Sequence, residues 1–553
     1  MRRSAAICLV LVLAVILLLF VPWFSFPIYP DEIAHRFWTS RFFIDGQQRT
    51  SLFAVCEGNH ILSIPWVFYP AGTILSLYSL IDNPAFNRIL AILSFLACFM
   101  LLWTVLAMRG GKGRAPRPVD YLSLAGLVFI AMIGVTPAAL VALRGEHFIM
   151  ILIATLLLLA VHVRSKLTAG VVLPLSLVIF LIFSIAAYSH PKTLYFAPAT
   201  LAIVILLCRG HRVIMIATSA LVLLTISASI FLGSQFVVCP ESEAVRSWVQ
   251  NFNYDPRTLF SNPLEYFFQI FFWNVGGGRD WSEFLSKLTF RNSFARDINY
   301  LPGVSNVPPG LNGLIGGLQV INLVVGAGFF LVVASRLFSR LRNRRVGASA
   351  QTSEVDAVSL VLFLVYLAIL THLLNNRSQA WYDVAFYHSS LVVVNIFGIL
   401  TQYRMNSWIV RSMALCGVAL AVSSGYFAYG NITPRFATGW RDNPSTLLHH
   451  YAAIDRTEIE TMRRKCLGGK DKVIFDNLTY IALQSVRFPT PIDYLAISFP
   501  GIRQGRPYFV TKYGFPGAIA ECASLGLGRT TTDGTPKVCG ARFSLESGWT
   551  ECR

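Results

Sequence analysis

Apolar stretches alternate with short polar breaks along most of this sequence. A helix needs about 20 mostly apolar residues to cross the hydrocarbon core of a bilayer, and runs of that order recur as far as residue 430. The pattern predicts eleven membrane-spanning helices, at 5–24, 88–107, 120–137, 147–163, 171–188, 193–208, 213–233, 311–335, 357–374, 387–403 and 411–430. We therefore expect a polytopic α-helical membrane protein.

Positive charges gather in alternate connections between these segments. One set of connections carries Arg2, Arg3, Arg109, Lys112, Arg114, Arg117, Arg164, Lys166, Arg209, Arg212, Arg336, Arg340, Arg342, Arg344, Arg345, Arg404 and Arg411. The short connections of the other set carry only Arg144, Lys192 and Arg377. Because cytoplasmic loops are enriched in Lys and Arg, this asymmetry predicts a cytoplasmic N-terminus. After an odd number of crossings, the C-terminus is expected outside.

The composition indicates a bilayer, and not nucleic acid, as the environment of this chain. Of its 553 residues, 55% are hydrophobic and only 13% are charged, which is unlike an ordinary soluble domain. The formal net charge of +18 is explained by the asymmetry of charge across a membrane. We therefore predict no nucleic-acid partner.

The first apolar segment begins as a secretory signal peptide does, with Met1-Arg2-Arg3 ahead of an apolar stretch. The small-residue cleavage pattern of such peptides is missing, because "LLLFVPWFSFPIYP" ends in bulky aromatic residues and prolines. We expect a retained membrane anchor.

This topology leaves three sizeable parts outside the membrane, at 25–87, 234–310 and 431–553. We expect residues 1–430 to form a transmembrane domain and 431–553 to form a separate extracytoplasmic domain. In that tail "KVIFD" and "PYFVTKY" are typical of strands, and "NLTYIALQSV" is typical of a helix. The tail is therefore predicted to be a small α/β domain.

The cysteines divide along the same topology. The outward parts contain Cys56, Cys239, Cys466, Cys522, Cys539 and Cys552, whereas the spans and their inner ends contain Cys8, Cys98, Cys208 and Cys416. Disulfides persist in oxidising outer compartments, so we expect them in the tail, which holds four of the six outward cysteines. Their pairing stays open, and six unpaired thiols are the alternative.

An acidic pair follows the first span, in "FPIYPDEIAHRFW". Pro30 suits the first position of a helix, and Asp31 and Glu32 fall in the first turn, where carboxylates complement the helix dipole. Helix initiation is therefore one interpretation. Helical spacing also places His35 four residues from Asp31 and Arg36 four from Glu32, so the second interpretation is a polar cluster at the membrane surface.

A second acid and isolated cations occur at the same predicted depth. "ALRGEHF" puts Arg144 and Glu146 at the outer end of two spans, and Lys192 and Arg377 stand in short outer loops. Each of these two cations has a histidine close by in sequence, which for Arg377 is His388. Scarce acids at one interface favour a functional site, and carboxylates beside cations suit a lipid-borne phosphate. Anchoring to head groups is the simpler interpretation of Lys192 and Arg377.

The layout resembles the GT-C superfamily of membrane glycosyltransferases, which includes protein O-mannosyltransferases and aminoarabinose transferases. The shared features are the acidic pair Asp31-Glu32 after the first span, Glu146 in the next short outer loop, about eleven spans, a long outer loop and an outward C-terminal domain. The resemblance in layout covers nearly the whole chain. The motif itself is only two residues long, and its position on the topology gives it weight.

This resemblance implies a transferase that moves a sugar from a polyprenyl-phosphate carrier to a glycan, lipid or protein acceptor, with inversion. By position, Asp31 would be the general base that deprotonates the acceptor hydroxyl, and Glu32 and Glu146 would orient the acceptor or hold the base. Cations would stabilise the phosphate leaving group. The residues expected to bind substrate or phosphate are His35, Arg36, Arg144, Lys192, Arg377 and His388.

Two other functions fit a protein of this layout. A lipid or polysaccharide transporter or flippase would place polar residues near the bilayer midplane and often shows internal repeats. This sequence shows no repeat, and its charges collect at the ends of spans. A ligase or polymerase of lipid-linked glycans would also act at the outer face, but it would not need the acidic pair.

The expected setting is a bacterial inner membrane with the site facing the periplasm, although an enzyme of the endoplasmic reticulum would have the same topology. No metal-ligand spacing is evident in the sequence, so we predict no metal and no other cofactor. Some relatives in the superfamily use a divalent cation and others use none. The donor sugar, the acceptor and the oligomeric state stay open.

Overall fold

The fold is described from a computed structural model of the chain. The residues that it describes are 3–24, 84–109, 121, 124–126, 128–129, 136–141, 143–162, 167–234, 261–264, 309–343, 353–375, 390–391, 393–395, 408, 411–412, 415–419, 421–422, 425–426, 457, 461, 464, 472–475, 540–544 and 548–551.

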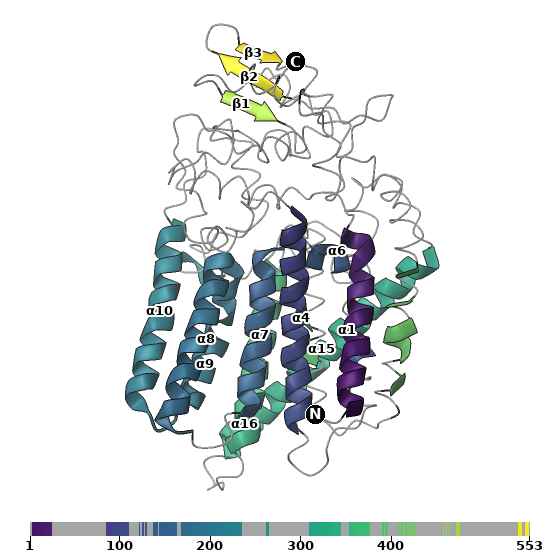
Figure 1. The fold of residues 1–553 in the computed structure, drawn as a ribbon. Helices are drawn as coiled ribbons and strands as arrows, with labels where there is room; N and C mark the ends of the chain where they lie inside the picture. The colour runs from purple at the N-terminus through teal and green to yellow at the C-terminus, as the bar shows by residue number, and fades with distance from the viewer. Residues whose placement is uncertain are drawn as a thin grey trace.

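A bundle of apolar helices forms the body of the described protein (Figure 1). Its elements are α1 (Arg3–Phe24), α4 (Pro84–Arg109), α6 (Thr136–Val141), α7 (Gly145–His162), α8 (Ala169–Ser189), η4 (Pro191–Phe196), α9 (Ala197–Leu207), α10 (Arg212–Ser234), α15 (Pro309–Asn343) and α16 (Ser353–Asn375). Among the described helices, four contain windows long and apolar enough to cross a membrane: Ala6–Trp23, Asn87–Thr104, Ala169–Ser189 and Arg212–Ser229. A helical membrane protein is therefore what the length and composition of these helices indicate.

Most of the described helices coincide with predicted spans, but the segment 193–208 differs. It begins as the 3₁₀ helix η4 and continues as α9, which has only 11 residues. Pro191 stands at the start of η4 and Pro198 at the start of α9, where a residue without an N–H is tolerated. The prolines therefore divide one apolar run into two elements. The predicted spans 120–137, 387–403 and 411–430 lie largely outside the described residues.

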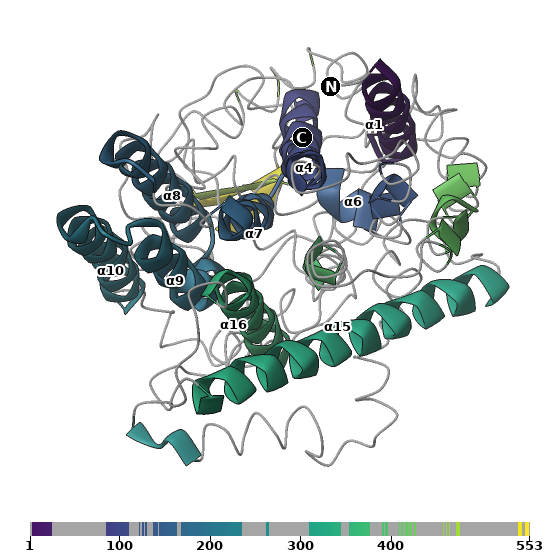
Figure 2. The same cartoon turned by 90° about the horizontal axis from the view of Figure 1, so that it is seen from below.

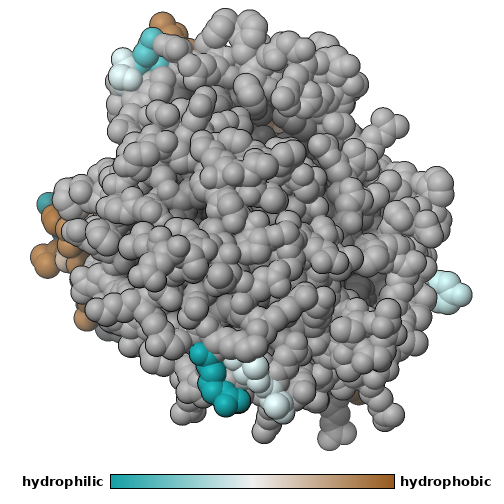
Figure 3. Space-filling model, turned by 90° about the horizontal axis from the view of Figure 1, so that it is seen from above, coloured by the Kyte–Doolittle hydropathy of each residue, from teal (hydrophilic) through white to brown (hydrophobic). Residues whose placement is uncertain are grey.

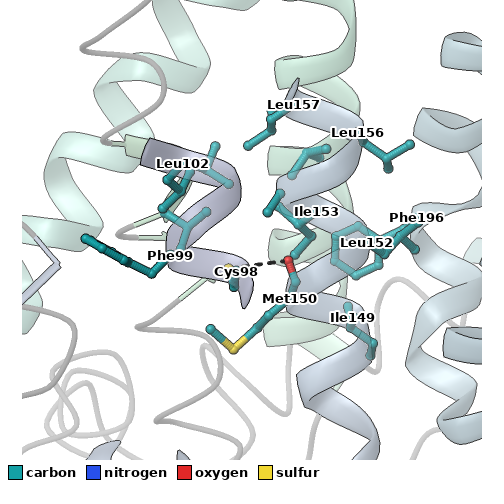
Figure 4. Close-up of a cluster of buried hydrophobic side chains, with 14 of the residues drawn as sticks. Cys98, Phe99, Leu102, Ile149, Met150, Leu152, Ile153, Leu156, Leu157 and Phe196 are labelled. Carbon is teal, nitrogen blue, oxygen red and sulfur yellow. Dashed lines mark hydrogen bonds between the residues drawn. The ribbon is translucent and has the colours of Figure 1, made fainter. Parts of the chain in front are cut away.

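Helix α7 occupies the interior of the bundle, between α4, α8 and α16 (Figure 2). Every residue from 152 to 157 is buried, as expected of a helix that is apolar on all sides. Figure 4 shows Cys98 of α4 facing Met150 of α7. The Cys98 Sγ donates to the Met150 carbonyl across this contact at 3.8 Å.

The outermost helix of the bundle, α10, presents hydrophobic side chains outward. Val213, Ile216 and Leu224 are exposed, and Figure 3 shows brown side chains at the edge of the molecule on the side where α10 lies in Figure 1. In a membrane protein such a surface is covered by lipid. Lipid contact explains why apolar residues lie on both the inner and the outer faces of this helix.

A buried polar pair joins α16 to the helical residues 393–395. The Tyr366 hydroxyl donates to Asn395 Oδ1 at 2.7 Å, and both residues are buried. Gly326 of α15 lies against the same site, since a Cβ there would be 3.4 Å from Asn395 Oδ1. Small residues that admit polar side chains are typical of contacts between membrane helices.

We expect Tyr366→Phe to lower the free energy of unfolding by about 0.6 kcal/mol, the average for a hydrogen bond between membrane helices, and by at most about 1.7 kcal/mol. The phenyl ring keeps the packing and removes only the hydroxyl that Asn395 accepts from. SDS titration of the purified protein in mixed micelles would measure the change. Tyr426→Phe is the matched control, because Tyr426 is 83% exposed. An equal loss in both variants would contradict the assigned role of the pair.

A three-stranded antiparallel sheet lies beyond the end of the bundle at which α1 finishes (Figure 1). It consists of β1 (Lys472–Phe475), β2 (Gly540–Ser544) and β3 (Gly548–Glu551), in the order β1-β2-β3. Lys472 pairs with Phe543, and Phe543 also pairs with Trp549. The strand predicted at "KVIFD" is confirmed by β1, whereas "NLTYIALQSV" and "PYFVTKY" lie outside the described residues.

The cysteines of the described spans carry free thiols, namely Cys8, Cys98, Cys208 and Cys416. The six cysteines assigned to the outward parts lie outside the described residues. The disulfides expected in the tail therefore stay a prediction.

Candidate functional site

A cluster of charged side chains lies where α7 begins and α8 ends, at the same end of the bundle as the C-terminus of α1 (Figure 1). Glu146 stands in the first turn of α7, just ahead of the apolar run 147–163, and there the helix dipole favours a carboxylate. Its side chain is only 7% exposed. A buried carboxylate needs partners.

Three side chains surround the Glu146 carboxylate. Arg144 approaches both oxygens, with Nε donating to Oε2 at 3.2 Å and a terminal guanidinium nitrogen donating to Oε1 at 3.5 Å. His190 Nε2 lies 3.4 Å from Oε1, and Lys192 Nζ lies 3.9 Å from the same oxygen. Glu146 therefore holds together residues from the turn before α7, the end of α8 and the start of η4.

The close approach of α7 and α8 depends on Gly145. A Cβ at this position would lie 2.6 Å from the Ser189 carbonyl oxygen and 2.8 Å from the His190 Cβ. The Ser189 carbonyl belongs to the backbone, so it cannot move aside to relieve this clash as the end of a flexible side chain could. Glycine is therefore the residue that lets His190 and Lys192 come within reach of Glu146.

We expect Gly145→Ala to lower the free energy of unfolding by about 1–3 kcal/mol, the usual cost of overpacking. The added methyl group would push the end of α8 away from the start of α7. Gly170→Ala in the first turn of α8 is the control, because no atom lies within 4 Å of a Cβ there. SDS titration of both variants would test this, and a Gly145→Ala protein as stable as Gly170→Ala would refute the steric argument.

The hydrogen bonds of His190 define its tautomer. Its Nδ1 accepts the backbone N–H of Lys192 at 3.2 Å and so caps η4, with His190 itself extended at φ −156° and ψ 130°. An accepting Nδ1 leaves the proton of the neutral ring on Nε2. Nε2–H then donates to Glu146, so a neutral His190 satisfies both partners at once.

His147 lies beside the cluster but is held by the backbone. Its Nε2 is 2.8 Å from the Leu140 carbonyl, which can only accept, so Nε2 carries the proton. Nδ1 then accepts the Arg144 N–H at 3.2 Å. The ring therefore fastens the turn between α6 and α7 that carries Arg144, which is a structural role.

Among the residues that the structure describes, the cluster holds two cations, Arg144 and Lys192, around one acid, Glu146. Burial by itself would raise the pKa of Glu146, but Arg144, with His190 and Lys192 acting in the same direction, holds that pKa well below its usual range. Glu146 is therefore ionised at neutral pH. Two cationic side chains that converge at one point also suit an anionic ligand.

A hydroxyl without a partner lies next to Lys192. Thr193 is fully buried, and its Oγ1 has no hydrogen-bond partner among the described residues. An unsatisfied buried hydroxyl costs free energy unless a ligand or water pairs with it.

The structure brings together three of the residues that the sequence marked for a site, namely Arg144, Glu146 and Lys192. Glu146 has its two oxygens engaged by cations and by His190, so it acts on its neighbours as a positioning residue. The residues that lie outside the described part of the chain are Asp31, Glu32, His35, Arg36, Arg377 and His388.

Sequence reasoning missed Gly145 and Arg88. It noted a histidine close to Lys192 in "YSHPKTLYF" but did not name His190 among the site residues. Arg88, placed at the first position of a predicted span, is fully buried and donates to the Trp23 carbonyl at 3.3 Å. This hydrogen bond joins the end of α1 to the start of α4. In the sequence, the acidic pair Asp31-Glu32 lies between these two helices.

Among the residues that the structure describes, no group of three or more His, Cys, Asp or Glu side chains is arranged to hold a metal ion. Comparison of the chain with protein-family models, with curated proteins and with solved structures found no match.

Proposed function

We propose that this protein is an integral-membrane glycosyltransferase of the GT-C type, with eleven spans and an outward α/β domain at residues 431–553. It moves a sugar from a polyprenyl-phosphate carrier to a glycan, lipid or protein acceptor at the outer face, with inversion. The setting proposed is a bacterial inner membrane, with the site facing the periplasm.

The observation that carries this proposal is the convergence of two cations, Arg144 and Lys192, on the Glu146 carboxylate at the end of an apolar bundle. The side chains of both cations are less than one-fifth exposed. A polyprenyl phosphate has an apolar tail that belongs among the lipids and an anionic head that belongs at the surface. A positively charged site at the end of membrane helices offers complementary surroundings to both parts.

The chemistry assigned to these residues is a single displacement. The acceptor hydroxyl oxygen attacks the anomeric carbon, the bond from that carbon to the phosphate oxygen breaks, and Asp31 takes the hydroxyl proton. The carrier leaves as a phosphate monoester, which gains one negative charge in the step. Arg144 and Lys192 stabilise that growing charge, while Glu146 keeps both cations in place.

Purified protein in lipid vesicles, supplied with polyprenyl-phosphate sugars, tests the proposal directly. Mass spectrometry of the lipids should show polyprenyl phosphate appearing in step with a glycosylated acceptor. The acceptor class is found beforehand by comparing the envelope glycans and carrier lipids of cells with and without the gene. Movement of an intact lipid-linked glycan across the bilayer, with no carrier released, would instead identify a transporter. Transfer of a whole glycan chain would identify a ligase or polymerase.

A further inference from the structure

Helix α15 is longer than a membrane crossing requires. Its 35 residues correspond to about 52 Å at 1.5 Å per residue, against a hydrocarbon core of about 30 Å. Figure 2 shows it lying obliquely across the bundle, beside α16. The apolar part is Val324–Ser339, and the helix continues beyond it to Asn343. The last turns therefore belong to the interface with water.

One face of α15 is directed at lipid along its length. Ile321, Val324, Leu331 and Phe338 are 53%, 64%, 65% and 65% exposed, at spacings of three and seven residues that keep them on one side of a helix. Arg342 follows Phe338 by four residues on the same side, and it is also exposed. The lipid-facing surface thus changes from hydrocarbon to guanidinium within one turn.

Positive charge is concentrated at this point of the chain. Arg336, Arg340 and Arg342 lie in the last eight residues of α15, and the sequence continues with Arg344 and Arg345. The acids closest in sequence are Glu354 and Asp356, in the first turn of α16. This stretch of the sequence therefore carries five cations and two acids.

We propose that the C-terminal end of α15 binds the head groups of anionic phospholipids. A lipid seated there covers Phe338 with its acyl chains and Arg342 with its phosphate, so one molecule complements both halves of the surface. Clusters of Lys and Arg at the end of a membrane helix attract anionic lipids in this way. The proposal concerns a different end of the bundle from the Glu146 cluster and does not depend on glycosyl transfer.

A fluorescent amino acid placed at position 338 tests the proposal in the full chain. The protein is reconstituted in phosphatidylcholine vesicles that contain a small fraction of lipid brominated on its acyl chains, either phosphatidylglycerol or phosphatidylcholine. The expected result is quenching about twofold or more stronger with the brominated phosphatidylglycerol. The same fluorophore at position 324, on the same face but about four turns away, should show a much smaller preference. Equal quenching by the two lipids at position 338 would overturn the proposal.

Charge variants identify the residues responsible. Arg340→Gln/Arg342→Gln should abolish the preference at position 338, whereas Arg340→Lys/Arg342→Lys should retain it. Arg212→Gln is the matched control, since it removes an exposed arginine at the same end of the bundle but on α10. Raising the salt concentration should weaken the preference of the unaltered chain, a measurement that does not depend on the folding of any variant. A preference that survives both salt and the glutamine variant, or that Arg212→Gln removes equally, would refute the site.

Discussion

The Asp31→Asn variant is expected to lose sugar transfer by about 10²–10⁴-fold while the protein stays folded, because this is the usual contribution of a general base. Asparagine has nearly the size of aspartate and keeps one oxygen for hydrogen bonding. It cannot take a proton from the acceptor hydroxyl. Binding of the donor lipid should therefore persist. The substitution should lower kcat and leave the KM for the donor nearly unchanged.

The adjacent acid supplies the comparison for this prediction. Glu32→Gln removes the same charge one residue further on. Because Glu32 is expected only to orient the acceptor, its substitution should lower the rate of sugar transfer less than Asp31→Asn does. Release of polyprenyl phosphate in vesicles measures both variants. If Asp31→Asn were as active as the unaltered protein, Asp31 would serve only to start a helix. If the Asp31→Asn protein still moved lipid-linked glycan across the bilayer without cleaving it, the result would favour the transporter interpretation.

The positions of most described helices could be predicted because hydropathy depends only on local sequence. The start of α7, for example, follows from the change from Arg144 to an apolar run. The division between η4 and α9 was not predicted, although Pro191 and Pro198 are visible in the sequence. A hydropathy window counts prolines as ordinary positions within an apolar run and carries no term for the missing N–H.

The extent of α15 was underestimated for a related reason. The predicted span ended at residue 335, directly before Arg336, whereas the helix continues to Asn343. Arginine is a good helix former, so charge ends the hydrophobic segment without ending the helix. The limit of a span and the limit of a helix are separate quantities.

The candidate site could be predicted only in part. Topology places Glu146 and Lys192 on one side of the membrane, because α7 and α8 lead away from that side and return to it. Their proximity within that side depends on how closely the two helix ends approach, which Gly145 decides through its contact with Ser189. Which ring nitrogen of His190 carries a proton depends on its hydrogen-bond partners. Neither packing distance nor tautomer can be read from a spacing pattern.

Replacing Glu146 with glutamine is expected to lower the free energy of unfolding by about 3 kcal/mol, since removing one partner of a buried ion pair leaves an uncompensated charge. Arg144 and Lys192 would both lose their shared counter-ion at side chains only 11% and 18% exposed. The amide of glutamine also turns one acceptor oxygen into a donor that faces other donors. SDS titration in mixed micelles measures the effect.

A second substitution separates lost charge balance from lost packing. Glu146→Gln/Arg144→Gln removes a cation together with the acid, so it should recover part of the stability that the single variant loses. Arg212→Gln, at an exposed arginine, should change little. If the double variant were less stable than Glu146→Gln by the full effect of Arg144→Gln alone, the two residues would not be coupled.

The pH dependence of the Glu146→Gln effect distinguishes a loss of charge from a loss of packing, because a packing defect alone would not depend on the protonation of Glu146. Burial opposes ionisation of Glu146, but Arg144, His190 and Lys192 lower its pKa well below the ordinary value of 4.5. A carboxyl whose pKa is lower in the folded state stabilises that state above its ordinary pKa, and the stabilisation is lost as the pH falls toward the folded value. The difference in free energy of unfolding between the unaltered protein and Glu146→Gln should therefore be constant near neutrality and shrink below about pH 4.5. A difference that did not change with acid would mean that Glu146 is not the charge that organises this cluster.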